Sequence, residues 1–198
     1  MPQTPTYSWP YPALSDPPNG AAQIEALAEA AESTVKSLDT RLTKVETPVR
    51  CRVRFSGSFF LAAGANLMAE GGWFAVSGED PLSMFSIAGD GFSQIRIPAG
   101  YGGLWAVSFH IRFSGNSGSR MAGVNKNSTD PTSGFILRDP RNATTDGGDG
   151  TQCRNFEEIM LADNDVLRWV TWSSVDCTVG NDFFGYPGAE IYVRRVSD

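Results

Sequence analysis

Residues 105–113 read WAVSFHIRF, a stretch in which large apolar side chains alternate with small or polar ones. Successive side chains of a β-strand point to opposite faces of a sheet. The pattern therefore predicts a strand with one buried face and one open face.

The same alternation recurs on both sides of this stretch. Cys51, Val53 and Phe55 alternate with three arginines, and further strands are expected around residues 166–170 and 191–193. Glycines separate these segments, and they fall at 71–72, 89–91, 100–103 and 147–150. Many short strands joined by such turns are typical of an antiparallel sandwich or jelly roll, so residues 48–198 are predicted to form a mainly β head.

Residues 21–47 follow a different pattern, an apolar repeat of seven residues typical of a coiled-coil helix. The repeat consists of Ile24, Ala28, Ala31, Val35, Leu38, Leu42 and Val45. A stripe of this period is hidden when helices wind around one another, so it predicts a stalk that trimerises the chain. The alternative is an amphipathic helix packed on its own domain. Asp16 and Asn19 are candidate N-caps, and Pro48 ends the helix.

Residues 1–20 hold six of the twelve prolines, together with aromatic side chains. Proline fixes φ and removes a backbone donor, so this segment is expected to be extended. Aromatic residues between prolines suit a peptide that docks on another protein, and the alternative is a tail without a partner. The predicted anchoring residues are Tyr7, Trp9, Pro10, Tyr11 and Pro12.

The formal net charge of -6 does not favour nucleic-acid binding, which needs clustered Lys and Arg. Arg50, Arg52 and Arg54 are interpreted as the outward face of one strand. No stretch approaches the ~20 apolar residues of a membrane span. Met1 to Pro12 lacks the pattern of a signal peptide, so the chain is expected to be made and kept in a cytosol, or to leave it by a route other than secretion.

The sequence offers little for metal or cofactor chemistry, and no cofactor is expected. Cys51, Cys153 and Cys177 lack metal-ligand spacing and flank apolar runs, which favours buried free thiols over a disulfide framework. His110 is the single histidine and lies on the polar face of the 105–113 strand, which suits a surface or subunit-interface residue better than a catalyst.

Three acidic pairs are candidate functional groups: Asp146 with Asp149, Asp163 with Asp165, and Glu157 with Glu158. Paired carboxylates serve glycoside hydrolysis only at a defined separation, which a sequence does not supply. The first pair, spaced by two glycines, suits either a calcium loop or a solvated turn, and the turn is favoured because the full ligand spacing is missing.

Short cues across residues 50–196 resemble the globular head of the complement and tumour-necrosis-factor (TNF) superfamily. The cues, in chain order, are VRFSG at 53–57, GF at 91–92, IPAG at 97–100, LWAVSFH at 104–110, AGVNKN at 122–127, LADNDVL at 161–167, FFGY at 183–186 and IYV at 191–193. The resemblance implies a ten-stranded jelly roll that assembles as a homotrimer. Departures are Asn164 in place of a usual glycine, a turn lengthened at Gly102-Gly103, and inserted residues at 186–190.

Residues 7–12 (YSWPYP) and 15–20 (SDPPNG), leading into the helix, are similar to the start of small virion proteins of tailed phages that infect actinobacteria. Proteins of that kind are minor tail or head-decoration proteins. The two resemblances agree on a plan of extended anchor, stalk and trimeric head.

The leading hypothesis is therefore a non-enzymatic virion protein on the particle surface, with its N-terminus docked on capsid or tail and its head displayed outward. Exposed loops at 115–120, 129–133 and 138–151 are expected to carry specificity. Host glycan is the expected ligand, with Trp73, Trp172 and Tyr186 as candidate stacking residues. The alternatives are a polysaccharide-degrading tail spike that uses Asp163 or Asp146, and a soluble TNF-like ligand.

Overall fold

The chain divides into two compact units, Met1–Pro48 and Val49–Asp198. The computed structural model describes Trp9 and residues 20–46, 49–68, 72–115, 117–142, 151–180 and 188–197. The unit that begins at Val49 contains all the described strands and is called the head below.

The first unit contains one described helix, α1 (Gly20–Glu46), close to the predicted bounds. Alanine, leucine, glutamate and lysine, which have high helix propensity, make up much of it. Lys36 Nζ lies 2.7 Å from Glu32 Oε1, an exposed i,i+4 pair that adds only a few tenths of a kcal/mol, about 0.3–0.5.

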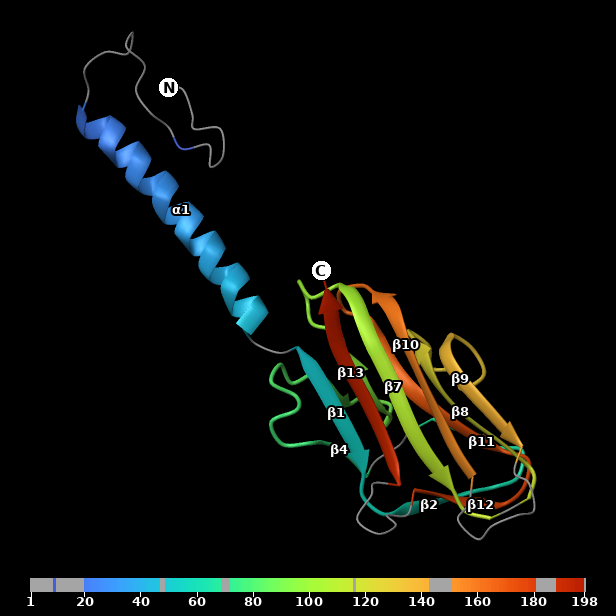
Figure 1. Ribbon diagram of the computed structural model, residues 1–198. Coiled ribbons are helices and arrows are strands. Elements are labelled where there is room, and N and C mark those ends of the chain that lie inside the picture. The colour runs from blue at the N-terminus through green and yellow to red at the C-terminus, as the bar shows by residue number, and fades with distance from the viewer. Residues whose placement is uncertain are drawn as a thin grey trace. The chain divides into compact units, whose positions relative to one another are not determined.

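The head is an antiparallel sandwich of two sheets. The first sheet has the order β2-β12-β7-β13-β1-β4, and β10 pairs with the other edge of β7. Its strands are β1 (Arg50–Phe55), β2 (Ser58–Leu61), β4 (Trp73–Ala75), β7 (Gly103–Phe113), β10 (Thr151–Leu161), β12 (Cys177–Gly180) and β13 (Ala189–Ser197). Figure 1 shows β1, β13, β7 and β10 side by side in one layer.

The second sheet has the order β5-β6-β11-β8-β9, and β3 also pairs with β11. Its strands are β3 (Asn66–Met68), β5 (Phe85–Ile87), β6 (Ser93–Arg96), β8 (Ser119–Lys126), β9 (Phe135–Asn142) and β11 (Val166–Ser173). The mainly β antiparallel sandwich predicted from the alternation is confirmed.

The core between the sheets is built from the apolar side of each alternation. Every apolar member of the 105–113 pattern is buried, as are Cys51, Val53 and Phe55 on β1. All three cysteines are buried free thiols, as expected from the sequence. Burial, with the Asp139 carboxylate adding to it, raises the pKa of the Cys153 thiol to about 12. These cysteines therefore behave as small core residues.

The turn that leads into β7 is held by Asp163. The Asp163 carboxylate accepts hydrogen bonds from the backbone amides of Gly100 and Gly102, at 2.7 and 2.6 Å. A Cβ at Gly102 would come within 3.0 Å of Asp163 Oδ1, so this close approach requires glycine. The next residue, Asn164, has a φ of 66°, which explains why the related pattern has glycine at this position.

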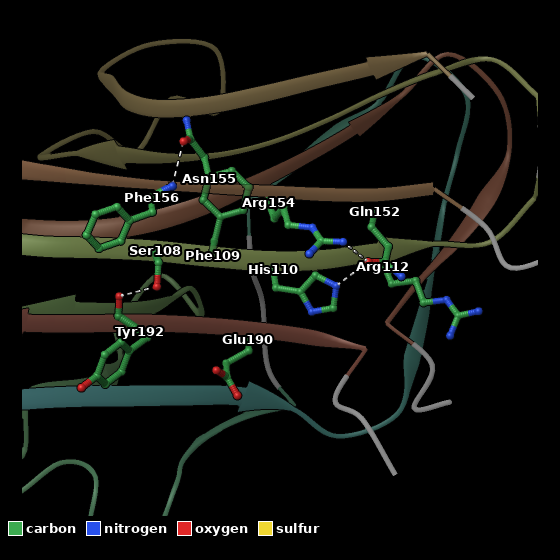
Figure 2. A pocket seen from close by; sticks show the side chains of 10 residues that line it. All are labelled: Ser108, Phe109, His110, Arg112, Gln152, Arg154, Asn155, Phe156, Glu190 and Tyr192. Carbon is green, nitrogen blue, oxygen red and sulfur yellow. Dashed lines mark hydrogen bonds between the residues drawn. The ribbon is translucent and has the colours of Figure 1, made fainter. Parts of the chain in front are cut away.

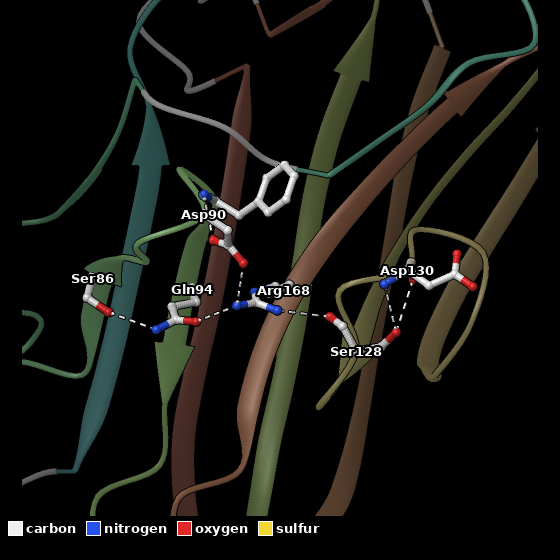
Figure 3. A network of polar contacts seen from close by, with 7 residues as sticks. Ser86, Asp90, Gln94, Ser128, Asp130 and Arg168 are labelled. Carbon is white, nitrogen blue, oxygen red and sulfur yellow. Dashed lines mark hydrogen bonds and ion pairs between the residues drawn. The ribbon is translucent and has the colours of Figure 1, made fainter.

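The outer face of the second sheet is covered around Arg168 and Asn125 by loops of the head itself. Arg168 on β11 is only 9% exposed, and its guanidinium donates to Ser128 O, Asp90 Oδ2 and Gln94 Oε1 at 3.2, 3.2 and 3.0 Å. Figure 3 shows this guanidinium between the two loops that carry Asp90 and Ser128. Asn125 on the same face is fully buried and donates to Asp130 O. We call this surface the closed face.

Candidate functional site

The outer face of the first sheet, called the open face, carries two rows of side chains set by the strand register. The first row runs across β10, β7, β13 and β1 as Arg154, His110, Glu190 and Arg54. The second row runs across the same strands as Phe156, Ser108, Tyr192 and Arg52. Because four strands pair in order, residues from distant parts of the sequence become neighbours on this face.

A hollow of about 740 Å³ lies on the open face. Its lining comes from β7, β10 and β13 and consists of Ser108, Phe109, His110, Arg112, Gln152, Arg154, Asn155, Phe156, Glu190 and Tyr192. Figure 2 shows Phe156 and Tyr192 on either side of Ser108, with His110, Gln152 and Arg112 toward the other end. The small Ser108 side chain leaves the space between the two rings empty.

The polar end of the hollow centres on Gln152. Its Oε1 accepts a hydrogen bond from Arg154 Nη2 at 3.0 Å and lies 3.3 Å from His110 Nε2. Burial lowers the pKa of His110, and the charges of Arg154 and Arg112 push it the same way, against Gln152 and Glu190. His110 is therefore mostly neutral at pH 7.

Glu190 is the one carboxylate among the lining residues, and arginines of β1 engage it. Arg54 Nε donates to Glu190 Oε2 at 2.8 Å, and Arg52 Nε lies 3.6 Å from Oε1. The Arg52 guanidinium also lies over the Tyr192 ring, 4.8 Å from its centre. Glu190 is thus paired on the β1 side, while the guanidinium of Arg154 donates to an uncharged amide.

Of the acidic pairs of the sequence, Asp163 and Asp165 serve turns. Asp165 accepts from Asn127 Nδ2 at 2.6 Å and from the Ala162 amide at 2.8 Å. Burial, which would raise the pKa of Asp165, is outweighed by these bonds and by Lys126, so the pKa lies below its ordinary value. Asp163 and Asp165 are therefore both engaged in turns. Glu157 and Glu158 are exposed on β10, and Asp146 and Asp149 lie outside the described residues.

Of the predicted stacking residues, the two that the structure describes, Trp73 and Trp172, lie on different sheets. Trp73 is only 5% exposed and packs edge-on against Trp169, with ring centres 4.8 Å apart, so its prediction as a surface ligand contact is wrong. Trp73 is buried because its ring packs among apolar core side chains, which include Phe55. Trp172 is half-buried on β11, beside Met121 and Asn66, and Tyr186 lies outside the described residues.

The apolar stripe of α1 is exposed in the single chain. Its large members are exposed by 70, 62, 50 and 54% at Ile24, Val35, Leu38 and Leu42. Ala28 is exposed and Ala31 is half-buried, while the side chain of Val45 lies outside the description. Exposed apolar rows of this size are unusual on a helix that has no partner.

Of the predicted anchoring residues, the structure describes only Trp9. Its indole Nε1 donates to Thr34 Oγ1 at 2.9 Å, and Thr34 in turn donates to Ala30 O. Tyr7, Pro10, Tyr11 and Pro12 lie outside the described residues.

Metal binding and membrane insertion find no support in the described part of the chain. Among its residues, no three His, Cys, Asp or Glu side chains gather closely enough to hold a metal ion. α1, its single helix, is not apolar enough to cross a membrane.

Comparison with known proteins identifies the fold of the head. No protein-family model matches the sequence, and no curated protein matches it. Among solved structures, Eiger TNF from S. frugiperda superposes with a TM-score of 0.53 at 12% identity, over 76% of this chain and 94% of that one. The head is a TNF-like jelly roll.

Two further structures share this fold. Murine APRIL gives a TM-score of 0.51 at 8% identity, over 76% of this chain and all of that one. The vertex protein P5 of the phage PRD1 gives 0.51 at 14% identity, over 75% of this chain and 96% of that one. At these identities the likeness concerns the TNF-like fold alone.

Sequence reasoning missed most of the hollow in this TNF-like head. It singled out His110 but gave no role to Ser108, Arg154, Phe156 or Tyr192. A usable signal was present on β10, where Gln152, Arg154, Phe156 and Glu158 fall at every second position. Without the register, nothing in the sequence says that this strand lies beside β7.

Proposed function

We propose that this protein is a structural, non-enzymatic virion component of a tailed phage: a trimer with an N-terminal anchor, a helical stalk and an outward-facing head for host-surface adhesion. The observation that carries the proposal is the exposed heptad stripe of α1, followed in the chain by a TNF-like head. The particle partner is a capsid or tail protein bound by residues 1–20.

The stripe supports oligomerisation on energetic grounds. Val35, Leu38 and Leu42 are each at least half exposed, and burying one such side chain contributes about 1.5–3 kcal/mol. Three helices that share the stripe would remove this surface from water. The stalk and the head then have separate tasks, association and display.

The virion setting draws its support from two independent features. The aromatic-proline pattern of residues 7–12 resembles the start of phage virion proteins. The fold of the head is also found in PRD1 vertex protein P5, a likeness of fold that is compatible with a particle role. A non-enzymatic role fits Asp163, whose two carboxylate oxygens are both engaged by backbone amides.

Sedimentation of the purified full chain tests the trimer. We expect the mass of three chains for the wild type and of one chain for a Leu38→Asp/Leu42→Asp variant, because four-residue spacing puts two charges into the stripe. The matched control is Ser33→Asp/Thr40→Asp, which adds the same charge to the helix face opposite the stripe and keeps the trimer.

A monomeric wild type would refute the proposed role of α1 as a trimeric stalk. Trimers of the Leu38→Asp/Leu42→Asp variant would show that the head alone drives assembly. Gold-labelled chain in images of the intact particle tests the virion location. Absence of label from purified particles would refute that part of the proposal.

A further inference from the structure

The helix α1 has a second distinct face besides its apolar stripe. Residues three or four apart on a helix share a face, and one series of this spacing is half-buried in the single chain. The series, called the covered face below, consists of Gln23, Ala26, Ala30 and Thr34. Ala28 belongs to the stripe and is exposed, although it is the same residue type as Ala26 and Ala30. The difference between these alanines therefore reflects what lies over each face.

Trp9 is hydrogen-bonded to the last residue of the covered face. Its indole Nε1 donates to Thr34 Oγ1 at 2.9 Å, and Thr34 Oγ1 donates in turn to Ala30 O at 2.9 Å. An indole that leaves water needs an acceptor for its N–H and apolar surface for its ring. Thr34 supplies the acceptor, and the small side chains of Ala26 and Ala30 leave room on the same face.

The half-burial of Trp9 favours its own helix over the particle as its binding partner. The indole has a single N–H donor, and Thr34 already accepts from it. A capsid or tail protein that bound Trp9 would first have to break this bond and uncover a half-buried ring. Trp9 is thus a contact within the unit Met1–Pro48.

Thr34 lies beside the weak half of the apolar stripe. Its neighbours on the helix surface, three residues before and four residues after, are the stripe members Ala31 and Leu38. The stripe has little apolar bulk here, because Ala28 and Ala31 each carry a single methyl group. Thr34 also directly precedes Val35 of the stripe, a position that flanks the core of a coiled coil and faces the neighbouring helix. An indole held at Thr34 therefore supplies apolar area where the alanines lack it.

We propose that Trp9 belongs to the stalk: its indole binds the covered face of its own α1 and strengthens the trimer in the alanine half of the stripe. The inference rests on the proposed trimer and changes one detail of it, because Trp9 no longer counts among the particle contacts. Tyr7, Pro10, Tyr11 and Pro12 remain the predicted particle contacts.

Fluorine NMR of the full chain labelled with 5-fluorotryptophan tests the contact. The chain has five tryptophans, and the resonance lost in Trp9→Phe is that of Trp9. Thr34→Val removes the acceptor at nearly constant shape and should shift this resonance. Thr40→Val is the matched control, because Thr40 is exposed and makes the same bond to the carbonyl four residues earlier, Lys36 O at 2.9 Å. It should leave the Trp9 resonance in place.

Sedimentation of the same proteins in a dilution series measures the effect on assembly. Trp9→Ala should raise the concentration at which half of the trimer dissociates by at least about tenfold, since each of the three chains loses a large apolar contact. Thr34→Val should raise it by a smaller factor, and Thr40→Val should leave it unchanged. Trp9 lies outside the helix and the strands, so Trp9→Ala leaves their residues intact.

The two measurements separate the possible failures. A Trp9 resonance that does not respond to Thr34→Val would overturn the proposal and return Trp9 to the predicted particle contacts. Equal dissociation of Trp9→Ala and wild-type trimers would overturn it as well. If such trimers are still lost in the Leu38→Asp/Leu42→Asp variant, the stalk stands without Trp9. A wild type that is monomeric at every concentration would instead refute the stalk together with this inference.

Discussion

The two outer faces of the sandwich are built from similar strands and differ in where their polar groups go. On the closed face, Arg168 and Asn125 are buried and donate to loops of the same head, and buried Gln94 accepts from Arg168. On the open face, Arg154 and Phe156 are exposed beside a hollow. The comparison teaches that a charged residue on a sheet can be part of the fold on one side and exposed in the single chain on the other.

The origin of the difference is the loops. Residues 88–92 and 127–134 reach over β11 and β8, and a carbonyl and a carboxylate group from them accept hydrogen bonds from Arg168 Nη1 and Nη2. Phe135 adds apolar cover, since its ring would come within 2.8 Å of a Cβ at Gly123. The open face consists of rows of side chains, with charges paired between strands as in Arg54–Glu190.

The largest difference is expected between two arginine-to-alanine changes. Arg168→Ala leaves Asp90, Gln94 and Ser128 O without their shared donor, which should lower the free energy of unfolding by about 3 kcal/mol. Arg154→Ala should change it by less than about 0.5 kcal/mol because the side chain is exposed. Urea titration measures both, and equal losses would contradict the distinction between the faces.

A second pair of changes makes the same comparison with apolar residues. Val170 is fully buried on β11, so Val170→Ala should cost about 2 kcal/mol. Phe156→Ala removes a larger side chain from the open face, yet its 58% exposure should keep the cost below about 1 kcal/mol. Thermal unfolding of the two variants would refute the comparison if Phe156→Ala were the less stable one.

The smallest effect concerns His110 and pH. Its pKa is lowered in the folded head from the ordinary 6.5, so below that value the unfolded chain binds the proton more readily. Stability should therefore fall as pH drops from 6.5 through the folded pKa.

His110→Gln should remove this pH dependence of stability, because the chain has no other histidine. Urea titration at about pH 7.5 and about pH 5.5 compares the variant with the wild type across the histidine range. A wild-type slope that persists unchanged in His110→Gln would contradict the assignment to this side chain.

Local patterns predicted much of the fold. The alternation at 50–55 and 105–113 correctly identified β1 and β7 and their buried sides, and the heptads gave α1. β10 was not predicted, since its core-facing positions include the polar Asn155 and Glu157. An alternating sequence pattern arises where one side of a strand is buried. β10 lacks the pattern because its core-facing side is only partly covered.

The site was harder to predict because it depends on pairing between distant strands. Ser108, Phe156 and Tyr192 form one row only through the registers of β7 with β10 and β13. Residue type alone favoured Trp73 as a ligand contact, but Trp73 lies in the core and packs on Trp169. Large aromatic side chains are as useful inside a sandwich as on its surface, so residue type did not separate the two.

The pairing of β1 with β13 also orders events during synthesis. Arg50 is paired with Arg194, so β1 has no partner on that edge until the ribosome has made almost the whole head. α1 precedes all the strands and consists of local contacts, which form quickly. We therefore expect nascent chains on neighbouring ribosomes to meet through their helices first and to complete their sandwiches afterwards, as already matched copies.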